Sequence, residues 1–107
     1  MTTVAAWLES RRPPPPEALA RRVHDALGPD AGRDVSEATE ALLAAAQRLA
    51  ATVLGDGDGG RGTASDLLAV DALVTFAFEA AAADPARLVD RAERAMRDLA
   101  RLAAVVP

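Results

Sequence analysis

Few residues of this chain have the types and spacing that chemistry requires, and the glycine-rich stretch 55–62 is the first to consider. It reads Gly-Asp-Gly-Asp-Gly-Gly-Arg-Gly, so two carboxylates alternate with glycines. A helix–loop–helix calcium site needs glycine at position 6 and a bidentate glutamate at position 12 of its loop. Counted from Asp56, these positions hold Arg61 and Leu67. A phosphate-binding loop needs a lysine, and the chain has none. We expect residues 55–62 to form a flexible Gly/Asp loop.

His24 is the only imidazole of the chain. The stretch 24–28, His-Asp-Ala-Leu-Gly, is similar in part to the His-x-Leu-Lys-Gly stretch of histidine phosphotransfer domains, which are helical bundles of this size. The leucine is displaced by one position, however, and the lysine is absent. A histidine near the C-terminal end of a helix interacts favourably with the helix dipole and needs no further function. No catalytic residue is therefore assigned here, and the role of His24 stays open.

A polar strip, Asp71, Thr75 and Glu79, crosses an otherwise apolar segment at intervals of four residues. On a helix these side chains share one side, and carboxylates buried there would have perturbed pKa values suited to acid–base chemistry or ligand binding. A di-iron bundle needs Glu-x-x-His motifs on two helices, and the chain has none. We predict no metal and no cofactor. The strip is either the solvent-exposed side of the helix or a set of ion-pair partners for arginines across an interface.

Composition limits the classes of function. The 107 residues are enough for one domain, 1–107, and the absence of cysteine excludes disulfides, zinc fingers and thiol nucleophiles. The net charge is −4, and the chain lacks the basic stripe on which nucleic-acid binding depends. No uncharged apolar run reaches the roughly 18–20 residues that span a membrane, and the N-terminus lacks the basic and apolar regions of a signal peptide, so we expect a cytoplasmic protein. The missing Lys, Ile, Asn, Tyr and Cys point to a GC-rich genome, such as that of a GC-rich bacterium.

The elements that must position these residues are all helical. Apolar side chains recur with helical period, and no alternating strand pattern is present. Prolines at 13–16 stop the first helix, so 12–16 is expected to be a rigid spacer. It contains the minimal PxxP ligand pattern, but the flanking arginines do not complete the usual form. We predict a small antiparallel helical bundle with two short N-terminal helices, about 3–11 and 16–27, and three long helices, about 35–54, 64–83 and 85–104.

The fourth of these helices is apolar almost all round, which is typical of a helix buried on more than one side. Phe76 and Phe78 lie about 160° apart on it, so if one ring packs on the core, the other faces a neighbour. About a quarter of the chain is alanine, which makes a thin core for a monomer. The helix is either the centre of a monomer or half of an oligomer interface. Candidate interface or pocket residues are Trp7, Leu68, Asp71, Thr75, Phe76, Phe78 and Glu79.

Three classes of function remain. The first is a non-enzymatic interaction or assembly module that acts as a homo-oligomer or as an accessory subunit, with a protein partner or self-association and neither nucleic acid nor membrane. The second is a ligand-binding or regulatory bundle whose pocket is anchored by Asp71, Thr75 and Glu79. The third is a small enzyme that works with carboxylates and arginines. The sequence favours the first, because it offers no nucleophile–base pair and no metal-ligand spacing.

Overall fold

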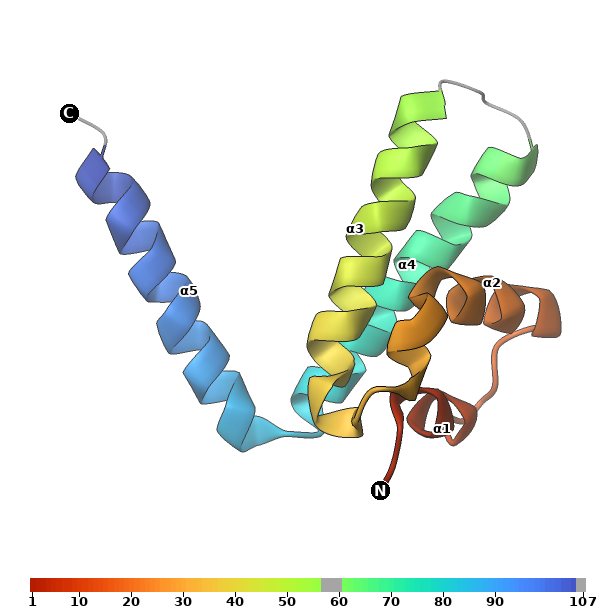
Figure 1. Cartoon of the computed structure of the whole chain (residues 1–107), viewed down its shortest axis with the longest axis horizontal. Coiled ribbons are helices and arrows are strands. Elements are labelled where there is room, and N and C mark those ends of the chain that lie inside the picture. The colour runs from red at the N-terminus through yellow and green to blue at the C-terminus, as the bar shows by residue number, and fades with distance from the viewer. Residues whose placement is uncertain (57–60, 106–107) are drawn as a thin grey trace.

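Every regular element of the computed structural model is a helix over the residues that it describes, 1–56 and 61–105 (Figure 1). The all-α fold class is confirmed, with helices packed against each other. No helix in this part of the chain combines the length and the apolar character needed to cross a membrane. The elements are α1 (Val4–Glu9), α2 (Glu17–Leu27), the 3₁₀ turns η1 (Gly28–Gly32) and η2 (Val35–Glu37), α3 (Ala38–Asp56), α4 (Arg61–Ala82) and α5 (Pro85–Val105).

The centre of the fold is an antiparallel hairpin of α3 and α4 (Figure 1). Leu42 of α3 and Leu73 of α4 are fully buried within it. Most of their buried neighbours are alanines, and small side chains let two helix backbones approach closely. The other buried residues of these helices are Ala38, Thr39, Ala41, Ala45, Ala46, Val53, Ala69, Ala77 and Ala81.

The helices α1 and α2 cover one side of this hairpin. Val4 of α1 and both Val23 and Leu27 of α2 are buried in the same core as Leu42. Thr3 caps α1, because its hydroxyl accepts a hydrogen bond from the Ala6 N–H at 3.1 Å. The left-handed φ of +55° at Gly28 ends α2, a conformation that costs glycine little.

The last helix, α5, diverges from the hairpin (Figure 1). Only Ala83 and Asp84 separate α4 from α5, and the Asp84 carbonyl accepts a hydrogen bond from the Leu88 N–H at 3.2 Å. Pro85 then opens the helix, where its missing N–H costs nothing. Side chains in the first two turns of α5 reach the start of α3, but every residue from 92 to 103 is exposed. The hairpin and α5 therefore form an open V joined at its base.

The ends of the helices differ from the predicted ends by a few residues. α1 stops at Glu9, because the Ser10 hydroxyl donates to the Trp7 carbonyl at 2.6 Å just before the prolines. α3 is preceded by the 3₁₀ turn η2, which Asp34 caps by accepting a hydrogen bond from the Ser36 N–H at 2.9 Å. α4 begins at Arg61 rather than near 64. Residues 57–60 of the predicted glycine-rich loop lie outside the described residues.

Candidate functional site

Three of the predicted candidates, Trp7, Phe76 and Glu79, meet at a joint between α1 and α4. The Trp7 and Phe76 rings pack edge to face, with centroids 6.5 Å apart and planes at 83°. The Arg11 guanidinium lies 4.8 Å from the Trp7 ring centroid, and its Nε donates to Glu79 Oε2 at 3.1 Å. Arg11 thus joins the aromatic pair to the carboxylate. These contacts hold α1 against the central hairpin. Trp7, Phe76 and Glu79 therefore contribute to the packing of the fold.

The structure does not join Asp71 and Thr75 to Glu79 as a chemical site. Both lie exposed on the outer surface of α4. Asp71 forms no ion pair with any residue in the described ranges, and the Glu79 carboxylate is already bonded to Arg11. The spacing of four residues is helical, as predicted, but no acid–base pair forms among the three.

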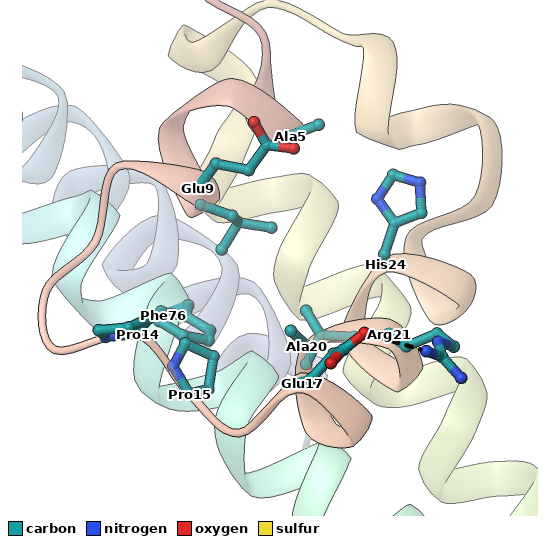
Figure 2. Close-up of a pocket in the computed structure, with 11 residues that line it drawn as sticks. Ala5, Glu9, Pro14, Pro15, Glu17, Ala20, Arg21, His24 and Phe76 are labelled. Atoms are coloured by element: carbon teal, nitrogen blue, oxygen red, sulfur yellow. Dashed lines mark hydrogen bonds and ion pairs between the residues drawn. The ribbon is translucent and has the colours of Figure 1, made fainter.

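A pocket of about 430 Å³ opens instead between α1, the proline segment and α2, with Phe76 of α4 at one wall (Figure 2). Its lining is mainly apolar and includes Leu8, Val23 and Phe76. Charged side chains stand at its rim, where Arg21 donates to Glu17 Oε1 at 3.3 Å. Neither Asp71 nor Thr75 nor Glu79 lines this pocket. The remaining lining residues are Ala5, Glu9, Pro14, Pro15, Ala20 and His24.

His24 has a place in this pocket that its sequence position did not reveal. It projects from the last turn of α2 and is exposed at the pocket rim (Figure 2). Glu9, Glu17 and Arg21 share that rim, so an amphipathic molecule with its apolar part inside would meet polar groups at the mouth.

The side of the hairpin away from α1 and α2 carries a second feature, a set of exposed apolar side chains. Leu43 and Leu54 lie three turns apart on one side of α3, and Leu67 and Phe78 lie three turns apart on one side of α4. All four are exposed, Leu54 and Phe78 to 82% and 69%. We call these four residues the open face.

Two contacts show which way the open face points. Phe78 lies about 160° around α4 from Phe76, which packs against α1. Arg48, whose guanidinium donates to the Ala26 carbonyl of α2 at 3.1 Å, lies about 140° around α3 from Leu43. The open face is therefore opposite the side that α1 and α2 cover. Leu68, also a predicted candidate, is 62% exposed on another side of α4, three turns from Glu79.

α5 carries an apolar stripe that stays largely exposed in the described part of the chain. Leu88, Ala92, Ala95, Leu99 and Leu102 follow each other at alternating intervals of four and three residues, which is the spacing of a coiled-coil seam. Val89 and Met96 widen the seam on one side. The leucines are 47%, 58% and 65% exposed. We call these seven residues the α5 stripe.

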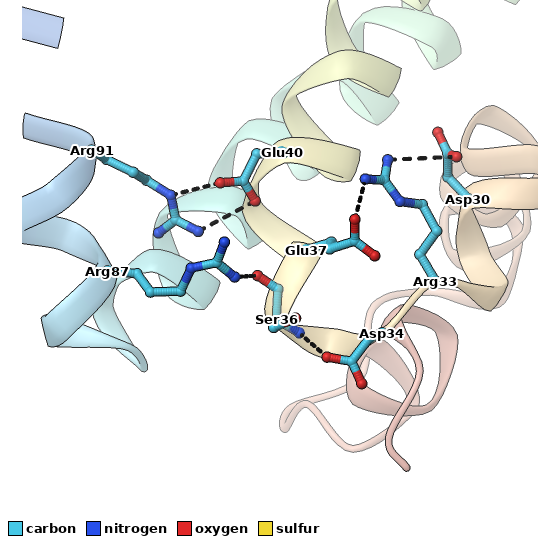
Figure 3. Close-up of polar contacts among 8 residues, drawn as sticks. All are labelled: Asp30, Arg33, Asp34, Ser36, Glu37, Glu40, Arg87 and Arg91. Atoms are coloured by element: carbon cyan, nitrogen blue, oxygen red, sulfur yellow. Dashed lines mark hydrogen bonds and ion pairs between the residues drawn. The ribbon is translucent and has the colours of Figure 1, made fainter. Parts of the chain in front are cut away.

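Two arginines hold the base of α5 against the start of α3 (Figure 3). Arg91 Nε donates to Glu40 Oε1 at 2.9 Å, and its Nη2 donates to Glu40 Oε2 at 3.3 Å. Arg87 donates to the Ser36 carbonyl. Arg91 Nη1 is buried with no acceptor among the described residues. Since Glu40 precedes Leu43 by one turn, α5 starts on the open-face side of the hairpin.

The carboxylates at this base favour their charged forms. Burial alone would raise the pKa of Glu40, but the hydrogen bonds from Arg91 outweigh it and hold the pKa below its ordinary value. The hydrogen bond from Arg33 lowers the pKa of Glu37, and the hydrogen bonds from Ser36 lower that of Asp34 (Figure 3). The contact between Arg91 of α5 and Glu40 of α3 therefore depends on an ionised carboxylate.

In the described ranges, no three histidine or carboxylate side chains gather in a way that could hold a metal ion. Comparison of the chain with models of protein families, with curated proteins and with solved structures finds no match. The function is therefore argued from the residues and their geometry.

The sequence analysis missed the pocket and the base of α5. The pocket depends on how the proline segment folds between α1 and α2, which no local pattern records. The sequence contains one indication of the contact at the base of α5. Arg87 and Arg91 lie one turn apart at the edge of the α5 stripe. Their position beside an apolar seam is typical of arginines that contact a neighbouring helix.

Proposed function

We propose that this protein is a non-enzymatic assembly module that binds protein through the open face and the α5 stripe. One observation carries the proposal: the chain holds a fully formed amphipathic helix away from its own core. Five of the eleven large hydrophobic residues that are exposed in the described part of the chain belong to α5. A surface helix of a monomer normally buries its apolar side, and larger exposed apolar patches mark interaction sites.

The chemistry of the remaining surface supports this choice over catalysis. Among the described residues, the pKa values of Arg33, Asp34, Glu37 and Glu40 depart clearly from their ordinary values, and these groups lie in charged contacts around the start of α3. Perturbed groups gathered in a cleft would favour an enzyme. Here Glu40 joins α3 to α5, and the other three groups bond to residues close to them in sequence.

The test is the state of the protein in solution and in cells. The tagged chain is purified from the source organism, and its molar mass is measured alongside that of a Leu102→Gln variant. We expect the parent to associate, with itself or with a second protein, and the variant to stay folded and associate less. A folded monomer that captures nothing in either form contradicts the proposal.

A second candidate function rests on the pocket between α1 and α2. Its volume and apolar lining suit a small amphipathic molecule, with Arg21 and His24 as polar groups at the mouth. The alternative predicted around Asp71, Thr75 and Glu79 thus moves to another part of the fold. Mass spectrometry of the natively purified protein tests it: we expect a bound small molecule that an Ala20→Trp variant, with the pocket filled, no longer carries. A parent that carries no such molecule contradicts it.

A further inference from the structure

The structure assigns an occupant to the V: we infer that a second copy of this chain inserts its α5 between the open face and α5, so that two copies clasp each other. This inference rests on the proposed function, because it names the partner of the same surfaces. In a two-fold dimer the exchange is reciprocal, and each α5 contacts both arms of the other copy's V.

The first argument is the area that the chain leaves uncovered. Its accessible surface is 7118 Å², whereas a compact monomer of 11.1 kDa has about 5,700 Å². Its radius of gyration is 15.6 Å, against about 13 Å for a compact chain of this length. The excess is about 1,500 Å² a chain, or about 3,000 Å² for two copies, which lies within the range that obligate homodimers bury.

The second argument is charge. Residues 85–105 contain five arginines and three carboxylates, a net charge of +2, whereas residues 1–84 contain seven arginines and thirteen carboxylates, a net charge of −6. The exposed Arg94 forms no ion pair with any described residue, and the same holds for Asp71 on α4. A basic helix is thus complementary to the acidic body of an identical chain.

The third argument is that the surfaces match in size. The open face supplies four large exposed hydrophobic residues, and α5 supplies five. At 1.5 Å a residue α5 is about 31 Å long, and α3 and α4 are about 28 Å and 33 Å long. The α5 stripe spans about 140° of its helix, which is wide enough to contact two neighbours at once.

The short connection explains why α5 is available for exchange. Two residues join α4 to α5, and Arg87 and Arg91 hold the base of α5 at an open angle to α3. Short hinges favour the exchange of an element between identical chains over closure within one chain.

Sedimentation velocity over a range of concentrations tests the inference with the full chain and two matched variants. Leu99→Gln changes the centre of the α5 stripe, and Arg97→Gln changes the opposite side of the same helix. We expect a parent dimer of twice 11.1 kDa. Its dissociation constant should rise about tenfold or more in Leu99→Gln, since two leucines are lost per dimer, and about twofold or less in Arg97→Gln. Circular dichroism confirms that each variant keeps its helices.

A distance within one chain distinguishes the reciprocal dimer from a monomer in which α5 folds onto its own hairpin. Spin labels at Gln47→Cys and Arg97→Cys report the angle between α3 and α5, measured with an excess of unlabelled chain; no native cysteine interferes. We expect the long distance of the open V. A dimer that Leu99→Gln does not weaken overturns the inference. A monomer that captures another protein overturns it too and leaves the proposed function standing, whereas a monomer with a short distance, α5 folded onto its own hairpin, overturns both.

Discussion

Among single residues, Arg11 makes the most varied contacts: it stacks on Trp7, pairs with Glu79 and so fastens α1 to α4. Arg11→Ala removes both interactions at once. We expect the free energy of unfolding to fall by about 1 kcal/mol, because the side chain is 34% exposed and solvent weakens both contacts. Urea denaturation followed by the fluorescence of Trp7 measures the change.

Arg12 is the matched control for this substitution. It is the next residue, it is exposed, and among the described residues its guanidinium donates hydrogen bonds to the backbone carbonyls of Glu9 and Arg11 and forms no ion pair. We expect Arg12→Ala to change the free energy of unfolding by less than about 0.5 kcal/mol. Equal losses in the two variants would show that the stack and the ion pair with Glu79 contribute nothing specific.

Glu40 gives the base of α5 a dependence on pH. Its pKa is lower in the folded protein than in the unfolded chain, so its contribution is complete above the ordinary value of about 4.3 and is lost as pH falls through the lowered value. Below that pH the bidentate pair with Arg91 is broken, and α5 is held mainly by Arg87. We expect the distance between spin labels at Gln47→Cys and Arg97→Cys to broaden in acid.

A Glu40→Gln variant separates this effect from the titration of other carboxylates. Glutamine does not titrate, so the label distance should already be broad at neutral pH and should change little as the pH is lowered. An identical pH profile in parent and variant would place the effect elsewhere, with Asp34 and Glu37 as the neighbouring carboxylates to change next.

At the scale of elements, the hairpin of α3 and α4 holds the fold together. Leu42 is fully buried between neighbours, whereas Leu43, the next residue, is 38% exposed on the open face. We expect Leu42→Ala to lower the free energy of unfolding by about 2–5 kcal/mol through lost burial and a cavity. Leu43→Ala should lower it by less than about 1 kcal/mol in the monomer. Thermal and urea denaturation at low protein concentration measure both changes. Equal losses in the two variants would contradict the finding that α3 turns Leu42 toward the core and Leu43 toward the open face.

Helical periodicity and proline positions were enough to predict the five helices, because both signals are local. The 35–54, 64–83 and 85–104 predictions match α3, α4 and α5 within about three residues. The direction of α5 was beyond this reasoning. A stripe such as Leu88 to Leu102 shows that a helix buries one side, but the same stripe serves a neighbour in its own chain or in another.

The candidate site was predicted less well, for the same physical reason. Phe76 and Phe78 were expected to face in opposite directions, and the structure confirms this: Phe76 packs on Trp7 and Phe78 is exposed. Asp71, Thr75 and Glu79 were grouped because they recur every four residues, on the assumption that side chains on one side of a helix have the same neighbours. The pairing of Glu79 with Arg11, sixty-eight residues away, depends on tertiary packing and leaves no local signal.

For the whole molecule, reciprocal exchange of α5 makes stability depend on concentration. Association that involves only the folded chain stabilises it by mass action. We therefore expect the melting temperature of the parent to rise with protein concentration, and that of Leu99→Gln to rise much less. Calorimetry over a hundredfold range of concentration measures the difference, and a constant melting temperature in the parent would mean that folding and assembly are not coupled.

The alanine seam between α3 and α4 has a consequence for how this chain can change over time. Ala41, Ala45, Ala69 and Ala77 are fully buried, so a larger side chain at any of them would displace a neighbouring helix. The exposed part of α5, by contrast, should accept substitutions without disturbing the hairpin of α3 and α4. Sequence drift should therefore collect on the surfaces that choose a partner, and a gene duplicate could acquire a new binding specificity while its interior stays the same.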